Sequence, residues 1–236
     1  MTTRNINPLI ITSLAILASL STNPVKAQTY DAAAQFSATS NPNGVWSYGF
    51  DTGTLDSGFS LYGDHVTFAN GLQAWDIVAG DNPSVIFNPT ASPITLNDTT
   101  WPALTLALHP GSAGQFSKLR FTVPTTGLFS IDTSFFGDST APATTDVYVL
   151  RNGNPLFSSF VNLNGLGNQT NYSAVIAASQ NDVIDFAVGR GNATHLSDTT
   201  GLRARVTGIP EASTALFGLA LLGATLTRQS RKKPNA

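Results

Sequence analysis

The chain of 236 residues contains no cysteine, which excludes disulfide bonds, thiol nucleophiles and cysteine-ligated metal centres. Between residues 28 and 208 the sequence has thirteen aspartates, no glutamate and six lysines or arginines, a formal charge of −7. Such a charge repels phosphate backbones and anionic lipid headgroups, which argues against nucleic acid and against direct electrostatic membrane binding. The same window has the length of one domain with a sizeable core.

The N-terminal segment has the features of a secretory signal peptide. Arg4 precedes an apolar run over residues 9–20, and Val25 and Ala27 place small residues where a signal peptidase reads them. An N-terminal membrane helix is the alternative, but a run this short is below the length that spans a bilayer. We therefore expect residues 1–27 to form a signal helix that signal peptidase removes after Ala27, which implies export.

The first half of the window 28–208 alternates short apolar segments with turn residues. Residues 32–36 can form one helical turn before the Asn-Pro-Asn-Gly sequence at 41–44 ends it. Trp46, Tyr48 and Phe50 then alternate with small residues, which is typical of a half-buried strand. Further strand candidates lie at residues 59–62, 74–78 and 85–88. Prolines flank the last of these segments, so we expect it to be an edge strand.

The second half of the window is more regular. Strand candidates lie at residues 104–109, 118–123, 128–136, 146–151, 156–161, 171–177, 182–188 and 202–207. Asn152 and Gly153 separate two alternating runs, which is the strongest short signal for a β-hairpin. About ten short strands without helical patterns between them predict an all-β protein, an antiparallel β-sandwich that is jelly-roll-like.

Several of these segments together resemble a domain that recurs in bacterial surface proteins. They are residues 36–49, 106–111, 145–150 and 182–189. The resemblance extends over most of the window 28–208. Because that domain is similar to carbohydrate-binding jelly rolls and has no settled function, the resemblance implies a fold more than an activity.

The C-terminal segment 209–236 combines a short polar motif, an apolar run and a basic end. Pro210 and Glu211 precede an apolar run over residues 215–226, and four basic residues follow between Arg228 and Lys233. In an exported chain the apolar run enters the bilayer while the cations stay on the cytoplasmic side. This order resembles the PEP-CTERM sorting signal of Gram-negative exported proteins, with Ala212 in place of the second proline of that signal.

The resemblance implies that the C-terminal segment is a sorting signal that directs the exported chain to its final location. An exosortase-like enzyme would process the chain near Pro210 and Glu211 and pass the domain to the cell surface or the extracellular matrix. Before processing, the hydrophobic helix would hold the chain in the membrane. The alternatives are an ordinary anchor helix and a buried core helix. The apolar run is shorter than the ~20 residues that a stable span prefers, which favours a transient anchor.

No segment carries a recognisable catalytic motif. A glycosidase needs two carboxylates at a matched separation, whereas Asp182 and Asp185 point to opposite faces of one predicted strand. His65, His109 and His195 lie in separate contexts without metal-binding spacing. We therefore expect no enzymatic activity, and a glycan-active hydrolase is the least favoured hypothesis.

Aromatic side chains offer a route to glycan binding. Sugar-binding sandwiches commonly expose flat rings, which stack on the apolar faces of pyranoses. The candidate ligand-binding residues are Trp46, Trp75, Trp101, Tyr48 and Tyr62, with Arg190 in a polar loop. The alternative for the rings is core packing, because aromatic side chains bury large apolar areas. The alternative for Arg190 is a solvated hairpin tip.

Calcium is the cofactor for which the sequence offers ligands. The oxygen-rich loops that begin at Asp138 and Asp198 supply carboxylate, hydroxyl and carbonyl oxygens at short range. Neither loop has the spacing of a calcium-loop motif, and both also fit ordinary turns. Calcium binding and a structural turn therefore remain alternatives for both aspartates.

Together these features predict an exported, non-catalytic β-sandwich that is displayed at the cell surface or in the extracellular matrix. Its predicted partner is a glycan or another extracellular polysaccharide. The alternative from another class is a purely structural surface or biofilm-matrix protein that binds no small ligand.

Overall fold

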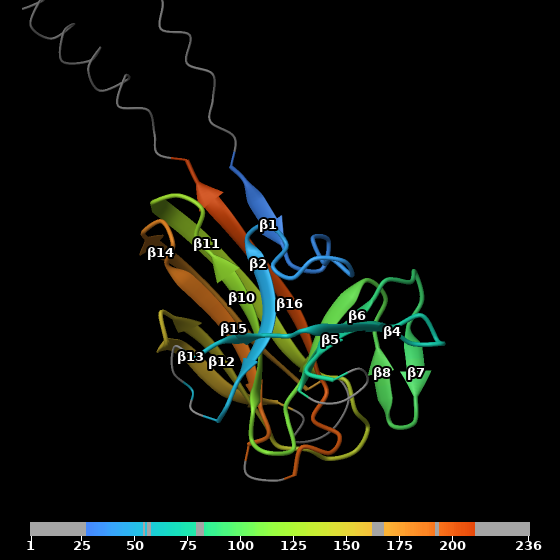
Figure 1. The fold of residues 1–236 in the computed structure, drawn as a ribbon. Coiled ribbons are helices and arrows are strands. Elements are labelled where there is room, and N and C mark those ends of the chain that lie inside the picture. Colours follow the sequence, from blue (N-terminus) through green and yellow to red (C-terminus); the bar gives the residue numbers. More distant parts are fainter. Residues whose placement is uncertain are drawn as a thin grey trace, which may run out of the picture. The chain divides into compact units, whose positions relative to one another are not determined.

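The computed structural model describes residues 27–53, 55, 58–78, 83–161, 168–191 and 194–210. All regular structure in these ranges is β-strand, and the strands form a two-layered antiparallel sandwich, which confirms the predicted fold class (Figure 1). Across the same ranges, no helix is long and apolar enough to cross a membrane. The two predicted terminal helices, and Glu211 with them, lie outside the described residues.

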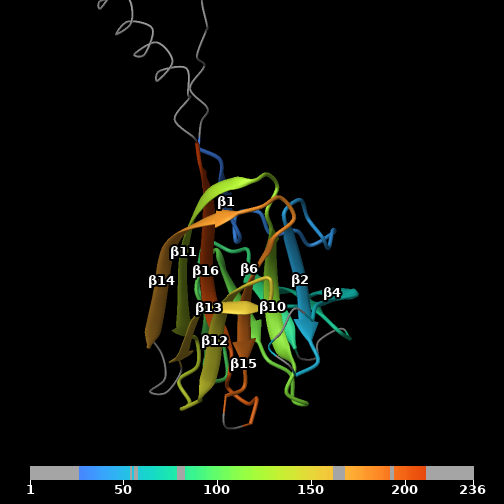
Figure 2. The same ribbon diagram turned by 90° about the vertical axis from the view of Figure 1, so that its left-hand side faces the viewer.

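The sandwich consists of two antiparallel sheets. Sheet A has the order β14 (Gln169–Ala178), β11 (Gly127–Gly137), β16 (Thr200–Ile209), β9 (Thr105–His109), β6 (Ser84–Asn88), β5 (Gln73–Asp76) and β4 (Asp64–Thr67), and β1 (Thr29–Asp31) pairs with β16. Sheet B has the order β13 (Asn154–Val161), β12 (Thr145–Arg151), β15 (Val183–Gly189), β10 (Phe116–Thr122), β2 (Trp46–Asp51) and β3 (Ser60–Leu61). Figure 2 shows β14, β11 and β16 of sheet A opposite β10 and β2 of sheet B.

The core lies between the sheets and follows the predicted alternation. Trp46 and Tyr48 of β2 point inward and are buried, as are Phe129, Ile131 and Phe135 of β11. Side chains of a strand alternate between its two faces, so the residues between them point outward. The interior face of each strand was therefore readable from the sequence.

The predicted hairpin at Asn152 and Gly153 joins β12 to β13. Both residues have positive φ, 50° and 79°, as a two-residue hairpin turn requires. The Asn152 amide also donates to Asp182 Oδ1 at 2.9 Å, and Arg151 donates to Asp182 Oδ2 at 2.7 Å. Led by the Asn152 hydrogen bond, these contacts and a Ser179 amide lower the pKa of Asp182 to about 2. Asp182 therefore stabilises the turn before β15 and lies just outside the strand.

Two expectations about the strands were wrong. The segment 85–88 was expected at a sheet edge, but β6 pairs with β5 on one side and with β9 on the other. Pro83 and Pro89 lie just outside β6, so they remove no hydrogen bond from its ladder. None of the predicted strands includes Trp101, yet it lies in β8 (Thr99–Trp101), which pairs with β7 (Ile94–Leu96).

The β7–β8 hairpin covers part of the outer face of sheet A. Trp101 packs there with Leu72, Ala74, Ile86 and Ala107, which makes a second, smaller apolar cluster. In Figure 1 the hairpin lies beside β6, at the end of the sheet away from β14. The outer faces of β16 and β11 are outside this cluster, and the candidate site lies there.

Candidate functional site

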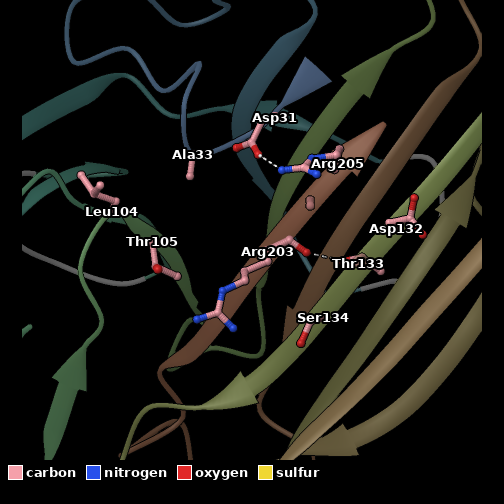
Figure 3. Close-up of a pocket in the computed structure, with 10 residues that line it drawn as sticks. Asp31, Ala33, Leu104, Thr105, Asp132, Thr133, Ser134, Arg203 and Arg205 are labelled. Atoms are coloured by element: carbon pink, nitrogen blue, oxygen red, sulfur yellow. Dashed lines mark hydrogen bonds and ion pairs between the residues drawn. The ribbon is translucent and has the colours of Figure 1, made fainter. Parts of the chain in front are cut away.

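A groove of about 450 Å³ lies along the outer face of β16. β16 pairs with β9 through Thr200–Leu202 and with β1 through Arg205–Thr207, so residues 203 and 204 lie where its two partners part. Figure 3 shows Leu104 and Thr105 on one side of this opening and Asp31 and Ala33 on the other. We call this feature the β16 groove.

Polar side chains from two neighbouring strands line the groove. Ser134 of β11 lies opposite Arg203 of β16, and Asp132 lies opposite Arg205. Arg205 Nη2 forms an ion pair with Asp31 Oδ2 at 3.2 Å. The lining therefore holds two arginines and two aspartates, whose formal charges cancel. A binding surface tends to match the charge of its ligand, so the groove suits a neutral polar molecule.

Arg203 is the side chain best placed to bind a ligand. Its guanidinium carbon lies 4.6 Å from the centroid of the Phe136 ring, which is a cation–π geometry. The Thr133 hydroxyl donates to the Arg203 carbonyl at 2.9 Å and fixes the backbone. Within the described ranges the guanidinium itself makes no hydrogen bond or ion pair. Its planar set of N–H donors, directed into the groove in Figure 3, is therefore available.

Asp132 supplies acceptors in another part of the groove, opposite Arg205. Ser173 Oγ of β14 donates to Asp132 Oδ1 at 2.6 Å, and Ser130 Oγ donates to Asp132 Oδ2 at 3.2 Å. These two hydroxyls orient the carboxylate, and each carboxylate oxygen keeps further acceptor capacity. The groove thus combines fixed acceptors with fixed donors, the chemistry that recognises hydroxyl groups.

Sequence reasoning missed this groove. The available signal was the alternation that places Asp132 and Ser134 on one face of a strand and Arg203 and Arg205 on one face of another. Those strands are some seventy residues apart in sequence, as Thr133 and Arg203 illustrate. Their adjacency follows from sheet order, which local periodicity does not contain.

The three tryptophans do not provide exposed rings. Trp46, Trp75 and Trp101 are 1%, 7% and 9% exposed. Trp46 Nε1 donates to Gln35 Oε1 at 2.9 Å, and Trp75 Nε1 donates to the Ser37 carbonyl at 2.7 Å. The premise of exposed stacking rings is therefore wrong for these residues, because the strand faces that carry them turn into the apolar clusters.

The remaining ligand-binding candidates also lie away from the groove. Tyr48 and Tyr62 are buried in the main core, and the Tyr62 hydroxyl donates to Ser117 Oγ at 3.0 Å. Arg190 is exposed, and its Nη1 donates to the Ser112 carbonyl at 3.0 Å. Arg190 links two loops and is not among the residues that line the groove. A ligand role for Arg190 stays a prediction.

The structure brings the two calcium candidates close together. Asp138 follows β11 and Asp198 precedes β16, and the Asp138 amide lies 3.4 Å from the Thr199 carbonyl. Both aspartates are fully buried, and in each one Oδ2 lacks a hydrogen bond within the described residues. Burial raises the pKa of Asp138 well above its usual range, with a smaller opposing effect of Arg203.

Asp198 has the same tendency. Burial raises the pKa of Asp198 to about 7, a hydrogen bond from Thr145 opposes this, and the charge of Asp146 adds to it. The Thr145 hydroxyl lies 3.3 Å from Asp198 Oδ1. Two buried carboxylates with spare oxygens fit a cation chemically. However, no group of three His, Cys, Asp or Glu residues in the described ranges can hold a metal ion.

Two of the histidines are neighbours, contrary to their separation in sequence. The rings of His109 and His195 lie 6.0 Å apart between centroids. Burial lowers the pKa of His109 to about 4, a hydrogen bond to the Pro110 carbonyl opposes this, and the charge of His195 adds to it. A neutral, half-buried His109 contributes to packing at the end of β9.

The predicted processing points flank paired strands. The Gly208 amide donates to the Gln28 carbonyl at 2.9 Å, and Thr29 lies opposite Thr207. Ala27 and Pro210, the outermost of these positions, are both exposed. The two predicted cleavages would therefore fall at one end of the sandwich, and both remain predictions.

Comparison with known proteins adds the following. No family model matches the chain, and no curated protein sequence matches it significantly. A CBM51 module from Clostridium perfringens GH95, solved with methyl-galactose, matches at 13% identity and a TM-score of 0.36, over 62% of this chain and 94% of that one. A family 35 carbohydrate-binding module from Clostridium thermocellum matches at 13% identity and a TM-score of 0.28, over 61% of this chain and 91% of that one. Rabbit GITRL matches at 17% identity and a TM-score of 0.27, over 41% of this chain and 74% of that one.

Proposed function

We propose that this chain is an exported, non-catalytic β-sandwich that binds a neutral glycan in the β16 groove. Export and sorting are inferred from the two ends of the sequence, where a signal peptide and a PEP-CTERM-like segment bracket the sandwich. After processing by signal peptidase and an exosortase-like enzyme, the sandwich would reside at the cell surface or in the extracellular matrix.

The observation that carries the proposal is the guanidinium of Arg203 on the Phe136 ring, directed into a charge-balanced groove. Arg203 offers donors, Asp132 and Ser134 offer oxygens, and Leu104 adds an apolar wall that is 59% exposed. A pyranose presents the complement, hydroxyl groups around an apolar ring face. A groove of this volume lies within the roughly 300–1,000 Å³ range of small-molecule sites.

A binding role fits these residues better than a hydrolytic one. Asp132 is exposed and held by two serine hydroxyls, and Asp31 is paired with Arg205. A glycosidase needs one carboxylic acid that retains its proton near neutral pH beside a second carboxylate. The buried carboxyls with raised pKa, Asp138 and Asp198, are not among the residues that line the groove.

Binding to a glycan array, followed by calorimetry on the best ligand, tests the proposal on the full chain. Arg203→Ala should weaken binding about tenfold to a hundredfold, because a hydrogen bond from a charged donor contributes about 1.5–3 kcal/mol. Arg190→Ala is the matched control, since it removes an exposed arginine outside the groove. Loss of binding in Arg190→Ala with retention in Arg203→Ala would move the site to that loop.

The rival function is a purely structural surface or matrix protein. It predicts that the wild-type chain binds no glycan while its display at the cell surface is normal. That result would reject the glycan proposal and leave the sorting proposal intact. Mass spectrometry of the chain from its native host tests sorting separately, because an intact C-terminus at Ala236 contradicts processing near Pro210 and Glu211.

A further inference from the structure

The outer face of sheet B buries a lysine against an aspartate. The Lys118 side chain is 0% exposed and the Asp51 side chain is 2% exposed, and Lys118 Nζ contacts Asp51 Oδ2 directly. Lys118 of β10 lies opposite Gly49 of β2, and Asp51 lies opposite Phe116. The two residues are therefore diagonal neighbours on one face, within reach of a long side chain.

The segment around Phe59 closes this site against water. A Cβ atom at Gly49 would lie 2.6 Å from the Phe59 ring, so the ring rests directly on the glycine. From the other side the guanidinium carbon of Arg120 lies 4.1 Å from the centroid of the same ring. Phe59 is thus held between β2 and β10, beside Lys118 in the sheet.

Two backbone groups position the reacting atoms. The Gly53 amide donates to Asp51 Oδ1 at 3.0 Å, and Lys118 Nζ donates to the Gly58 carbonyl at 3.1 Å. One carboxyl oxygen is therefore held by a donor, and the other faces the amine. Moving two charges out of water costs several kcal/mol for each ion. A neutral amide in the same place would carry no such cost.

We propose that Lys118 and Asp51 form an intramolecular isopeptide bond. One ammonium proton passes from Nζ to the carboxylate, and the neutral amine then attacks Cγ of Asp51. The Gly53 N–H stabilises the charge that develops on Oδ1, as donors of this kind do in acyl transfer. The Cγ–Oδ2 bond breaks, and Oδ2 leaves as water with the two protons that Nζ has given up. The product is a secondary amide, and the step needs no oxidant or co-reactant.

The bond would link β2 to β10 and enclose residues 51–118, which include the whole of β3 to β9. A chain without cysteine cannot make a disulfide, and this cross-link would restrain the unfolded chain in the same way. The inference is independent of glycan binding, because the pair lies on sheet B and the groove lies on sheet A.

Mass spectrometry of the purified full chain, denatured before measurement, tests the bond directly. The wild-type chain should be lighter than its sequence by one water, and proteolysis should yield one branched peptide that contains both Asp51 and Lys118. A wild-type chain of full mass, with the two residues in separate peptides, overturns the proposal whether or not any variant folds.

Two variants assign the bond to these atoms. Lys118→Met keeps the length of the side chain without the amine and should restore the full mass. Asp51→Ala removes the carbon that the amine attacks and should also restore the full mass. A water deficit that persists in Lys118→Met would place the loss elsewhere and reject the assignment.

Discussion

The outer faces of the two sheets use charged side chains in different ways. On sheet A the Arg205 and Asp31 side chains are 60% and 36% exposed, and Arg203 is open to the groove. On sheet B the Lys118–Asp51 pair is sealed beneath Phe59. Charged side chains that are exposed to solvent remain accessible to a ligand. Buried charged side chains interact instead with groups of the chain itself.

A second buried ion pair on sheet B supports this distinction. Arg120 donates twice to Asp185, through Nε at 2.6 Å and Nη2 at 2.8 Å, and the Asp185 side chain is 1% exposed. The same guanidinium packs on the Phe59 ring. Both of these buried pairs therefore lie against the segment around Phe59.

The largest expected effect comes from Asp51→Ala. This change leaves the Lys118 charge buried without its aspartate, which typically costs about 3–5 kcal/mol. Loss of the proposed cross-link adds to this, since a closed loop of roughly 67 residues contributes about 4 kcal/mol in the chain-entropy treatment. Urea unfolding measures the sum.

Two comparisons give the Asp51→Ala result its meaning. Asp132→Ala removes an exposed carboxylate from sheet A and should change the free energy of unfolding by no more than about 0.5 kcal/mol. Asp51→Asn keeps the side-chain size but removes the carboxylate that takes the proton from Nζ, so it should lose the ion pair and the cross-link together and resemble Asp51→Ala. Equal losses in Asp51→Ala and Asp132→Ala would erase the contrast between the two faces.

Gly49→Ala tests the cover itself. A Cβ at this position meets the Phe59 ring and the Ser60 carbonyl, and overpacking of this kind costs about 1–3 kcal/mol. Gly127→Ala is the matched control, because nothing lies within 4 Å of a Cβ there. Thermal unfolding of both variants should separate them, and a neutral Gly49→Ala would show that the segment moves aside freely.

The fold was predictable because its determinants are local. Alternation placed Trp46 and Tyr48 inward, and Asn152–Gly153 supplied the positive φ values of a hairpin. The groove and the buried pair were not predictable, because each depends on segments that are far apart in sequence. Lys118 lies at an outward position of an alternating strand, and its contacts with Asp51 and with the Gly58 carbonyl come from segments about sixty residues away in sequence.

Asp198 is a third kind of ionisable group, a buried carboxyl that forms no ion pair with any of the described residues. Burial raises the pKa of this carboxyl to about 7 from an ordinary value of 3.8, so the folded chain binds its proton more tightly than the unfolded chain. The resulting stability is present at low pH and is lost as pH rises from about 4 to about 7. Asp198→Asn should flatten this decline, by on the order of 1 kcal/mol given that one pKa unit is about 1.4 kcal/mol.

Asp182→Asn is the control for that pH profile. The pKa of Asp182 is lowered to about 2, chiefly by the Asn152 hydrogen bond, so its contribution is present above about pH 4 and is lost as pH falls toward about 2. Its window therefore lies below that of Asp198.

Calcium added at neutral pH tests the calcium alternative, because ligation at Asp138 and Asp198 would favour their charged forms and raise the melting temperature. An unchanged melting temperature would argue against calcium there.

Arg203→Ala should have only a small effect on stability, and it tests whether the Arg203 side chain on sheet A is free to bind a ligand. The side chain makes one ring contact and no hydrogen bond or ion pair within the described residues, so its removal should cost no more than about 0.5–1 kcal/mol, the value of an exposed cation–π contact. Urea unfolding of Arg203→Ala and Arg120→Ala compares an open with a covered arginine. Arg120→Ala should be much the less stable, because it leaves Asp185 buried without its cation. If Arg203→Ala and Arg120→Ala lost equal free energy of unfolding, Arg203 would be a structural residue, and a ligand site in the β16 groove would no longer be supported.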